Sequence, residues 1–185
     1  MQEDKIVTVE NKKDEKFLRE RTAEFTFSER GEPVMRGKKI AAQEIGSLIL
    51  RMKKVMKRAN GIGLSANQIG LPYKLFIAQV PDRQGDYKFY AIFNPQLEKA
   101  SAGKVAMEEG CLSIPGIYGE VERHEQATLR GFDKKGKSLK IKAWGLLARV
   151  FQHEVDHLNG KLFIDRTKLL YYTPASERLK GTEGN

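Results

Sequence analysis

Residues 152–160, with the sequence QHEVDHLNG, constrain what this chain can fold into more than any other feature. They contain the pattern His-Glu-x-x-His and two of the three histidines of the chain, His153 and His157. Positions i and i+4 lie above one another on one face of an α-helix, so both imidazoles can reach one metal ion. Glu154 stands where a carboxylate can act as general base toward water on that ion. The Asn-Gly end predicts a left-handed cap for a helix that begins near Gly145. The pattern therefore indicates a hydrolytic metal site in the last turns of a helix.

The third metal ligand is left open by this motif. A catalytic metal site has three protein ligands and an open position, and the candidates are a downstream Asp or Glu, His124 and Cys111. The sequence after Gly160 contains neither Glu-x-x-x-Asp nor the His-x-x-Gly-x-x-His continuation found in common metallopeptidases. A lone cysteine is most often a small buried apolar residue, but coordination by a metal deprotonates a thiol. His124 lies in an alternating polar segment, and we expect it at the surface.

Length and composition favour a single domain. The 185 residues can bury one sizeable core but not two, and 40% hydrophobic with 31% charged residues is typical of a globular protein. A single cysteine excludes an internal disulfide and fits a reducing compartment. The first residues are acidic with no apolar stretch behind them, and no segment approaches the roughly 18 apolar residues of a spanning helix. We therefore expect a cytoplasmic protein that makes no contact with a membrane.

The pattern of apolar residues predicts an α+β fold. Residues 40–59 repeat apolar side chains with the period of an amphipathic helix, and a helix-prone stretch surrounds Phe17 and Leu18. Residues 31–37 predict a break in regular structure. Strands are expected at 6–9, 74–80, 87–93, 104–107, 120–129 and 138–143. We predict one compact domain over residues 1–185, with a polar tail from about 173, in which mainly antiparallel strands pack around the metal-binding helix and a second long helix.

The net charge of +9 raises the question of a nucleic-acid partner. The lysines are spread along the whole chain, and short clusters such as Lys53-Lys54 contain no interleaved aromatic side chains. This distribution is typical of a solvated surface. We expect no sequence-specific nucleic-acid binding.

Three segments, in this order and spacing, resemble the peptide deformylase family. Residues 61–68 read GIGLSANQ, close to the family pattern Gly-x-Gly-Leu-Ala-Ala-x-Gln. Residues 109–113 read EGCLS, and residues 152–158 read QHEVDHL. The similarity extends over roughly residues 38–166. His-Glu-x-x-His alone is moderate evidence for a hydrolase, whereas three ordered motifs are specific.

The resemblance implies removal of the formyl group from N-formylmethionyl nascent peptides. It makes Cys111, His153 and His157 the ligands of one divalent ion, with Fe²⁺ in the usual native enzyme and Zn²⁺ or Ni²⁺ as substitutes. Water activated by the ion would attack the formyl carbon while Glu154 takes its proton and passes it to the departing amine. The resemblance assigns stabilisation of the oxyanion to the Leu112 backbone N–H and the Gln68 amide, together with the metal.

The remaining site residues follow from the same resemblance and from position. Gly61 and Gly63 would let the loop backbone pair with the peptide chain. The methionine side chain needs an apolar pocket, for which the candidates are Ile62, Met107, Leu146 and Val150, all of which can equally be ordinary core residues. Glu109 is a candidate to orient Gln68 or the cysteine loop, and Arg123 a candidate to pair with Glu109. We expect a bacterial-type cytoplasmic monomer, with the ribosome near the exit tunnel as a further candidate partner.

Some features depart from the family pattern, and other functions stay open. Ser65 replaces the usual alanine, a change expected to alter local hydrogen bonding more than shape. The stretch before Leu18 lacks the Pro-x-Pro pattern of many relatives, and the tail after Asp165 is short. A zinc peptidase acting on unformylated peptides is the rival enzyme, and an RNA- or ribosome-binding module with a structural metal is the rival of another class. A zinc deaminase is disfavoured because no Pro-Cys-x-x-Cys segment is present.

Overall fold

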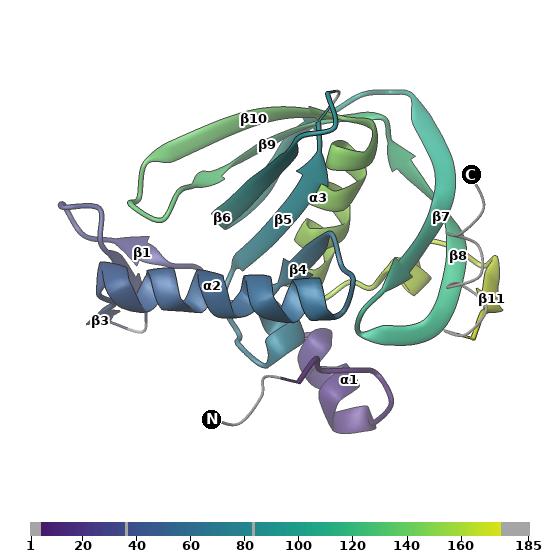
Figure 1. Ribbon diagram of the computed structural model, residues 1–185, viewed down its shortest axis with the longest axis horizontal. Helices are drawn as coiled ribbons and strands as arrows, with labels where there is room; N and C mark the ends of the chain where they lie inside the picture. The colour runs from purple at the N-terminus through teal and green to yellow at the C-terminus, as the bar shows by residue number, and fades with distance from the viewer. Residues whose placement is uncertain (1–4, 36, 83, 175–185) are drawn as a thin grey trace.

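The computed structural model describes residues 5–35, 37–82 and 84–174, which form three α-helices and eleven strands (Figure 1). The helices are α1 (Lys12–Leu18), α2 (Ala42–Arg58) and α3 (Gly145–Leu158), with short 3-10 helices at η1 (Ala66–Ile69) and η2 (Phe163–Asp165). The strands are β1 (Thr26–Phe27), β2 (Pro33–Met35), β3 (Lys38–Lys39), β4 (Gly63–Ser65), β5 (Leu75–Pro81), β6 (Tyr87–Ala100), β7 (Lys104–Cys111), β8 (Ile114–His124), β9 (Gln126–Phe132), β10 (Ser138–Trp144) and β11 (Leu170–Tyr172).

A five-stranded antiparallel sheet, in the order β10-β9-β6-β5-β4, is covered on its two faces by the two long helices. Successive side chains of a strand point to opposite faces, and β5 is apolar on both. Leu75 and Ile77 pack with the apolar stripe of α2. Phe76 and Ala78 pack on the other face with α3, against Phe151. The sheet thus fixes the position of α3.

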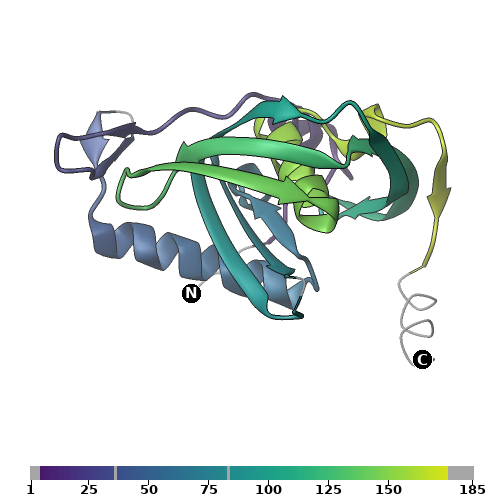
Figure 2. The ribbon, with the colours of Figure 1, turned by 90° about the horizontal axis from the view of Figure 1, so that it is seen from above.

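A second, strongly curved sheet in the order β11-β8-β7 lies on the other side of α3. Figure 1 shows α3 between this sheet and the five-stranded sheet, and Figure 2 shows the same arrangement from above. β4 ends one sheet and β7 ends the other, so each strand has an edge that pairs with no other strand of the described chain. β7 ends at Cys111, and the turn that follows leads into β8 at Ile114.

Most of the predicted elements are present. The α+β class with mainly antiparallel strands is confirmed, and the predicted helix at 40–59 is α2. The helix predicted from Gly145 begins there, and Gly160 has a φ of 73°, the left-handed conformation expected of its cap. Within the described residues, no helix is long and apolar enough to cross a membrane.

Several predictions of local structure are wrong. Residues 6–9 form no strand, because the Val7 N–H donates to the Gln68 carbonyl in η1 and the Val9 N–H donates to the Ser113 carbonyl in the β7–β8 turn. The predicted break at 31–37 contains β2, which belongs to a small sheet with β1 and β3. The single strand predicted at 120–129 is two strands, β8 and β9, divided at Glu125. Strand β11 was not predicted, and the predicted tail lies outside the described residues from 175 onward.

Candidate metal and catalytic site

Three potential metal ligands converge where α3 faces the β7–β8 turn. His153 and His157 lie one helical turn apart, with their Nε2 atoms 3.2 Å from each other. The Sγ atom of Cys111, at the end of β7, lies 3.1 Å from His157 Nε2. All three ligand atoms fall within 4.8 Å of one another. The predicted Cys-His-His set is therefore brought together by two elements that are far apart in sequence.

The spacing and chemistry of these atoms fit one bound divalent ion. Two ligand atoms of a tetrahedral ion, with bonds of about 2.0–2.3 Å, lie on the order of 3.3–3.6 Å apart. Burial, aided by the charge of His153, holds the pKa of His157 well below its usual value, so this imidazole is in the neutral form that binds metals. A thiolate and two imidazoles suit several transition metals, so the residues do not select one ion.

His153 is oriented by the buried carboxylate of Glu109. Glu109 Oε2 lies 3.0 Å from His153 Nδ1, which leaves Nε2 turned toward the other ligands. Arg123 donates two hydrogen bonds of 2.9 Å to the same carboxylate, and Arg149 donates one of 2.7 Å. Burial alone would raise the pKa of Glu109, but the hydrogen bonds from His153 and Arg123 outweigh it and keep that pKa far below its usual range.

The ion pairs extend from Glu109 to two further charged residues, Asp156 and Arg166. Arg123 also binds Asp156, which in turn accepts hydrogen bonds from Arg166. We call Glu109, Arg123, Arg149, Asp156 and Arg166 the charge network. The proposed pairing of Arg123 with Glu109 is present, whereas Glu109 contacts His153 rather than Gln68. Arg149, Asp156 and Arg166 were not predicted, although Arg149 precedes His153 by four residues on one helix face, a spacing that indicates a shared environment.

Glu154 lies in different surroundings, between α3 and β4. It is 3% exposed, and its Oε2 accepts a hydrogen bond of 2.7 Å from the Ser65 hydroxyl. Burial raises its pKa to about 7, against the opposing effects of His153 and Ser65. A carboxyl group with a pKa near neutrality can both accept and return a proton, as a general base and acid must.

The Gln68 amide is held in a defined orientation. Its Oε1 accepts a hydrogen bond of 2.9 Å from the Ser65 backbone N–H, so its NH₂ group turns toward Cys111 Sγ, 3.5 Å away, and Ser113 Oγ, 3.2 Å away. The donor side of the amide therefore faces Cys111, one of the three potential ligands. Leu112 follows Cys111 in the β7–β8 turn, and its side chain contacts the position where a Cβ on Gly61 would lie.

The predicted pocket residues differ in exposure. Ile62, Met107 and Leu146 are exposed at 40%, 43% and 40%, whereas Val150 is buried. Exposure at this level shows that Ile62, Met107 and Leu146 are not core residues. Val150 Cγ1 would lie 3.1 Å from a Cβ at Gly63, which places Val150 under the β4 backbone.

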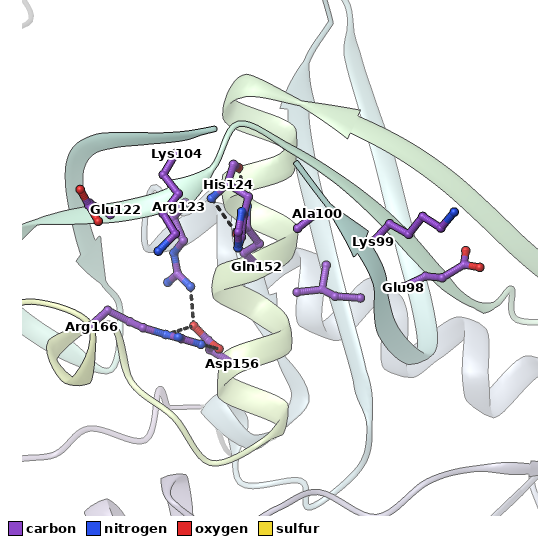
Figure 3. A pocket seen from close by; sticks show the side chains of 11 residues that line it. Glu98, Lys99, Ala100, Lys104, Glu122, Arg123, His124, Gln152, Asp156 and Arg166 are labelled. Carbon is purple, nitrogen blue, oxygen red and sulfur yellow. Dashed lines mark hydrogen bonds and ion pairs between the residues drawn. The ribbon is translucent and has the colours of Figure 1, made fainter. Parts of the chain in front are cut away.

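A cavity of about 390 Å³ lies beside α3 and is lined in part by the charge network (Figure 3). Arg123, Asp156 and Arg166 line it, together with Gln152 and His124. The expectation that His124 is a surface residue is wrong: its side chain is half-buried and its Nδ1 contacts the Ser101 carbonyl. Gln152 bonds both backbone polar groups of His124, so this side of α3 is anchored to β8.

This fold and site define a class of metal-dependent hydrolases built on a His-Glu-x-x-His helix. The polypeptide deformylase family model matches residues 18–171. The peptide deformylase of Halothermothrix orenii is 43% identical over 140 residues, which are 74% of this chain and 88% of the relative. The chain belongs to the peptide deformylase family, whose members remove the N-formyl group from nascent peptides, and this chain is such an enzyme.

Solved structures of peptide deformylases have the same fold as this chain. Peptide deformylase from Thermotoga maritima superposes with a TM-score of 0.74 at 29% identity, covering 94% of this chain and 100% of that chain. The class I type b peptide deformylase from Acinetobacter baumannii, in a structure with Met-Ala-Ser bound, superposes with a TM-score of 0.72 at 27% identity, covering 88% of this chain and 96% of that chain.

Proposed function

We propose that Cys111, His153 and His157 hold one divalent ion, natively Fe²⁺, beside which Glu154 acts as the general base and acid of deformylation. Zn²⁺ or Ni²⁺ would occupy the same donors. The observation that carries this proposal is the position of Glu154, a buried carboxyl group adjacent in sequence to one member of the ligand set, with a pKa raised to about 7. When bound, the ion supplies Lewis-acid activation of water and of the formyl carbonyl.

Glu154 then removes a proton from the attacking water and delivers it to the amine of the departing peptide. The NH₂ group of Gln68 and the backbone N–H of Leu112 stabilise the negative charge that develops on the formyl oxygen. The fixed orientation of Gln68 supports this role, because donors that are already oriented need no rearrangement in the transition state. Removing one such donor typically costs about 2.7–4 kcal/mol of barrier stabilisation.

The peptide would bind as an added strand between the unpaired edges of β4 and β7. The bare backbone at Gly61 and Gly63 allows the substrate to come close, and main-chain hydrogen bonds of this kind are independent of side-chain sequence. Ile62, Met107 and Leu146, with Val150 beneath, would contact the methionine side chain. The bound Met-Ala-Ser of the Acinetobacter baumannii relative belongs to the same class of peptide.

We further propose that the enzyme is a cytoplasmic monomer that meets its substrates near the ribosomal exit tunnel, with no membrane partner. Its net charge of +9 would favour approach to the anionic ribosome. Analytical ultracentrifugation and cosedimentation with ribosomes at two salt concentrations test these two points.

The proposed chemistry is tested by anaerobic purification, metal analysis and kinetics on formyl-Met-Ala-Ser beside an unformylated control. We expect formate release from the formylated peptide alone, and a loss of about 10²–10⁴-fold in kcat for Glu154→Ala with metal retained. Cleavage of the unformylated peptide would identify a peptidase instead. Near-normal turnover by metal-loaded Glu154→Ala would refute the role of Glu154.

A further inference from the structure

Ser65 stands in β4 where the family pattern has alanine, and its hydroxyl contacts the carboxylate of Glu154. We propose that Ser65 is a positioning residue, whose hydroxyl fixes one oxygen of Glu154 so that the other is presented to the reacting water. The inference rests on the proposed role of Glu154. It concerns a group that the family pattern itself does not supply.

The geometry follows from the two-residue period of a strand. Residues i and i+2 point to the same face, so Gly63 and Ser65 both face α3. Ser65 Oγ lies 2.7 Å from Glu154 Oε2, while a Cβ placed on Gly63 would lie 2.3 Å from Glu154 Oε1. The carboxylate therefore lies across β4, with one oxygen bound to a hydroxyl and the other against a residue that has no side chain. An alanine at position 65 would remove the only side-chain donor to Glu154 that the described residues provide.

The Ser65 hydroxyl contacts Glu154 at two points. A serine hydroxyl donates one hydrogen bond and can accept others. Ser65 Oγ lies 2.7 Å from Glu154 Oε2 and 3.1 Å from the main-chain oxygen of the same residue. The hydroxyl therefore links the carboxylate to the backbone of α3 and restricts the orientation of the Glu154 side chain.

The backbone and the side chain of Ser65 contact two different site residues. Its backbone N–H binds Gln68 Oε1 at 2.9 Å, and its side chain binds Glu154. The residue is fully buried. Ser65→Ala keeps the backbone contact to Gln68 and removes the one to Glu154, which makes it a selective test of the side chain.

The experiment compares wild-type, Ser65→Ala and Ser65→Cys enzymes, each loaded with metal, on formyl-Met-Ala-Ser. We expect Ser65→Ala to lower kcat by about 3–10-fold, tenfold being about 1.4 kcal/mol, because a hydrogen bond to a charged group is lost. KM should change less than about twofold and metal content should stay the same, because the hydroxyl contacts Glu154 and none of the three proposed metal ligands. Ser65→Cys keeps the shape of the side chain at a slightly larger size but is a weak donor, and its kcat should fall with that of Ser65→Ala.

A double variant tests whether the hydroxyl of Ser65 acts through Glu154. Adding Ser65→Ala to Glu154→Ala should cause no further loss, because no carboxylate remains to be positioned. Unchanged kcat in Ser65→Ala, wild-type kcat in Ser65→Cys, or a full additional loss in the double variant would each overturn the inference. If Glu154→Ala is inactive and Ser65→Ala is normal, only this inference fails. If Glu154→Ala itself is active, the proposed function fails.

Discussion

Glu109 and Glu154 are two buried carboxylates on either side of His153, and their surroundings are opposite. Glu109 is bound by the imidazole and by two arginines, and the hydrogen bonds from His153 and Arg123 outweigh its burial and keep its pKa far below its usual range. Glu154 has a hydroxyl and a glycine beside it, and its burial raises its pKa to about 7. Fixed cations turn the first carboxylate into a permanent charge that orients a ligand. Their absence from the described contacts of the second leaves it able to exchange a proton.

The contrast predicts that Glu109→Gln and Glu154→Gln fail in different ways. Glu109→Gln leaves Arg123 and Arg149 buried with a neutral partner, which should lower the free energy of unfolding by about 3–5 kcal/mol. It should also weaken metal affinity about 10–100-fold, because His153 loses its orienting partner. Glu154→Gln should keep both properties and lose turnover. Denaturant unfolding and chelator competition measure the difference.

Glu120→Gln is the matched control, because Glu120 is an exposed carboxylate on the neighbouring strand β8. It should match the wild type in both assays. A Glu109→Gln protein with unchanged stability and metal affinity would contradict the assignment of the charge network.

The neutral surroundings of Glu154 are tested most directly at Gly63. A Cβ there would lie 2.3 Å from Glu154 Oε1, so Gly63→Ala must displace the carboxylate. We expect kcat to fall up to about 100-fold, the cost of misplacing a catalytic group by about 1 Å, with metal content unchanged. Gly46→Ala in α2 is the control, since a Cβ at Gly46 meets no atom within 4 Å. Equal activity of the two variants would show that the carboxylate can move without penalty.

The pairing of Glu109 with His153 also predicts how metal binding depends on pH. Burial lowers the pKa of His153, but Cys111 and Glu109 outweigh it and raise that pKa to about 10 in the metal-free protein. His153 therefore holds a proton at neutral pH, and that proton must leave before Nε2 can bind an ion. Apparent metal affinity should rise with pH, by up to about tenfold per unit, as one proton is released.

Chelator competition at pH 6, 7 and 8 measures this slope. In Glu109→Gln the proton is held less strongly, and the slope should be shallower. A pH-independent affinity in the wild type would show that His153 is already deprotonated.

The sequence predicted those site residues that lie close to one another along the chain. His153, Glu154 and His157 share one helix, the spacing of the two histidines alone indicated a common face, and the resemblance added Cys111. Among the partners of Glu109, only Arg123 was proposed from its position in the sequence, whereas His153 and Arg149 were not. Arg149 and Arg123 reach that carboxylate from α3 and β8, and only the curvature of β7–β8 around α3 brings them together.

The errors in local structure have a similar cause. The apolar alternation at 6–9 is real, but Val7 and Val9 bond to Gln68 in η1 and to Ser113 in the β7–β8 turn instead of to a strand. The pattern across 120–129 continues through Glu125, and nothing in it marks the point where the chain leaves one sheet and enters another. The replacement at Ser65 was expected to alter hydrogen bonding, yet the identity of the acceptor required the position of α3.

The smallest predicted effect concerns the outer end of the charge network. Arg166 is 41% exposed and binds Asp156, which also has the fully buried side chain of Arg123 as a partner. Arg166→Ala therefore removes a partly solvated pair and leaves the inner one intact. We expect a loss of about 1 kcal/mol in the free energy of unfolding and less than about a twofold change in kcat and metal affinity. Denaturant unfolding and steady-state kinetics test this. A loss of metal affinity as large as in Glu109→Gln would mean that the orientation of His153 depends on the whole chain of ion pairs as one unit rather than on its nearest member.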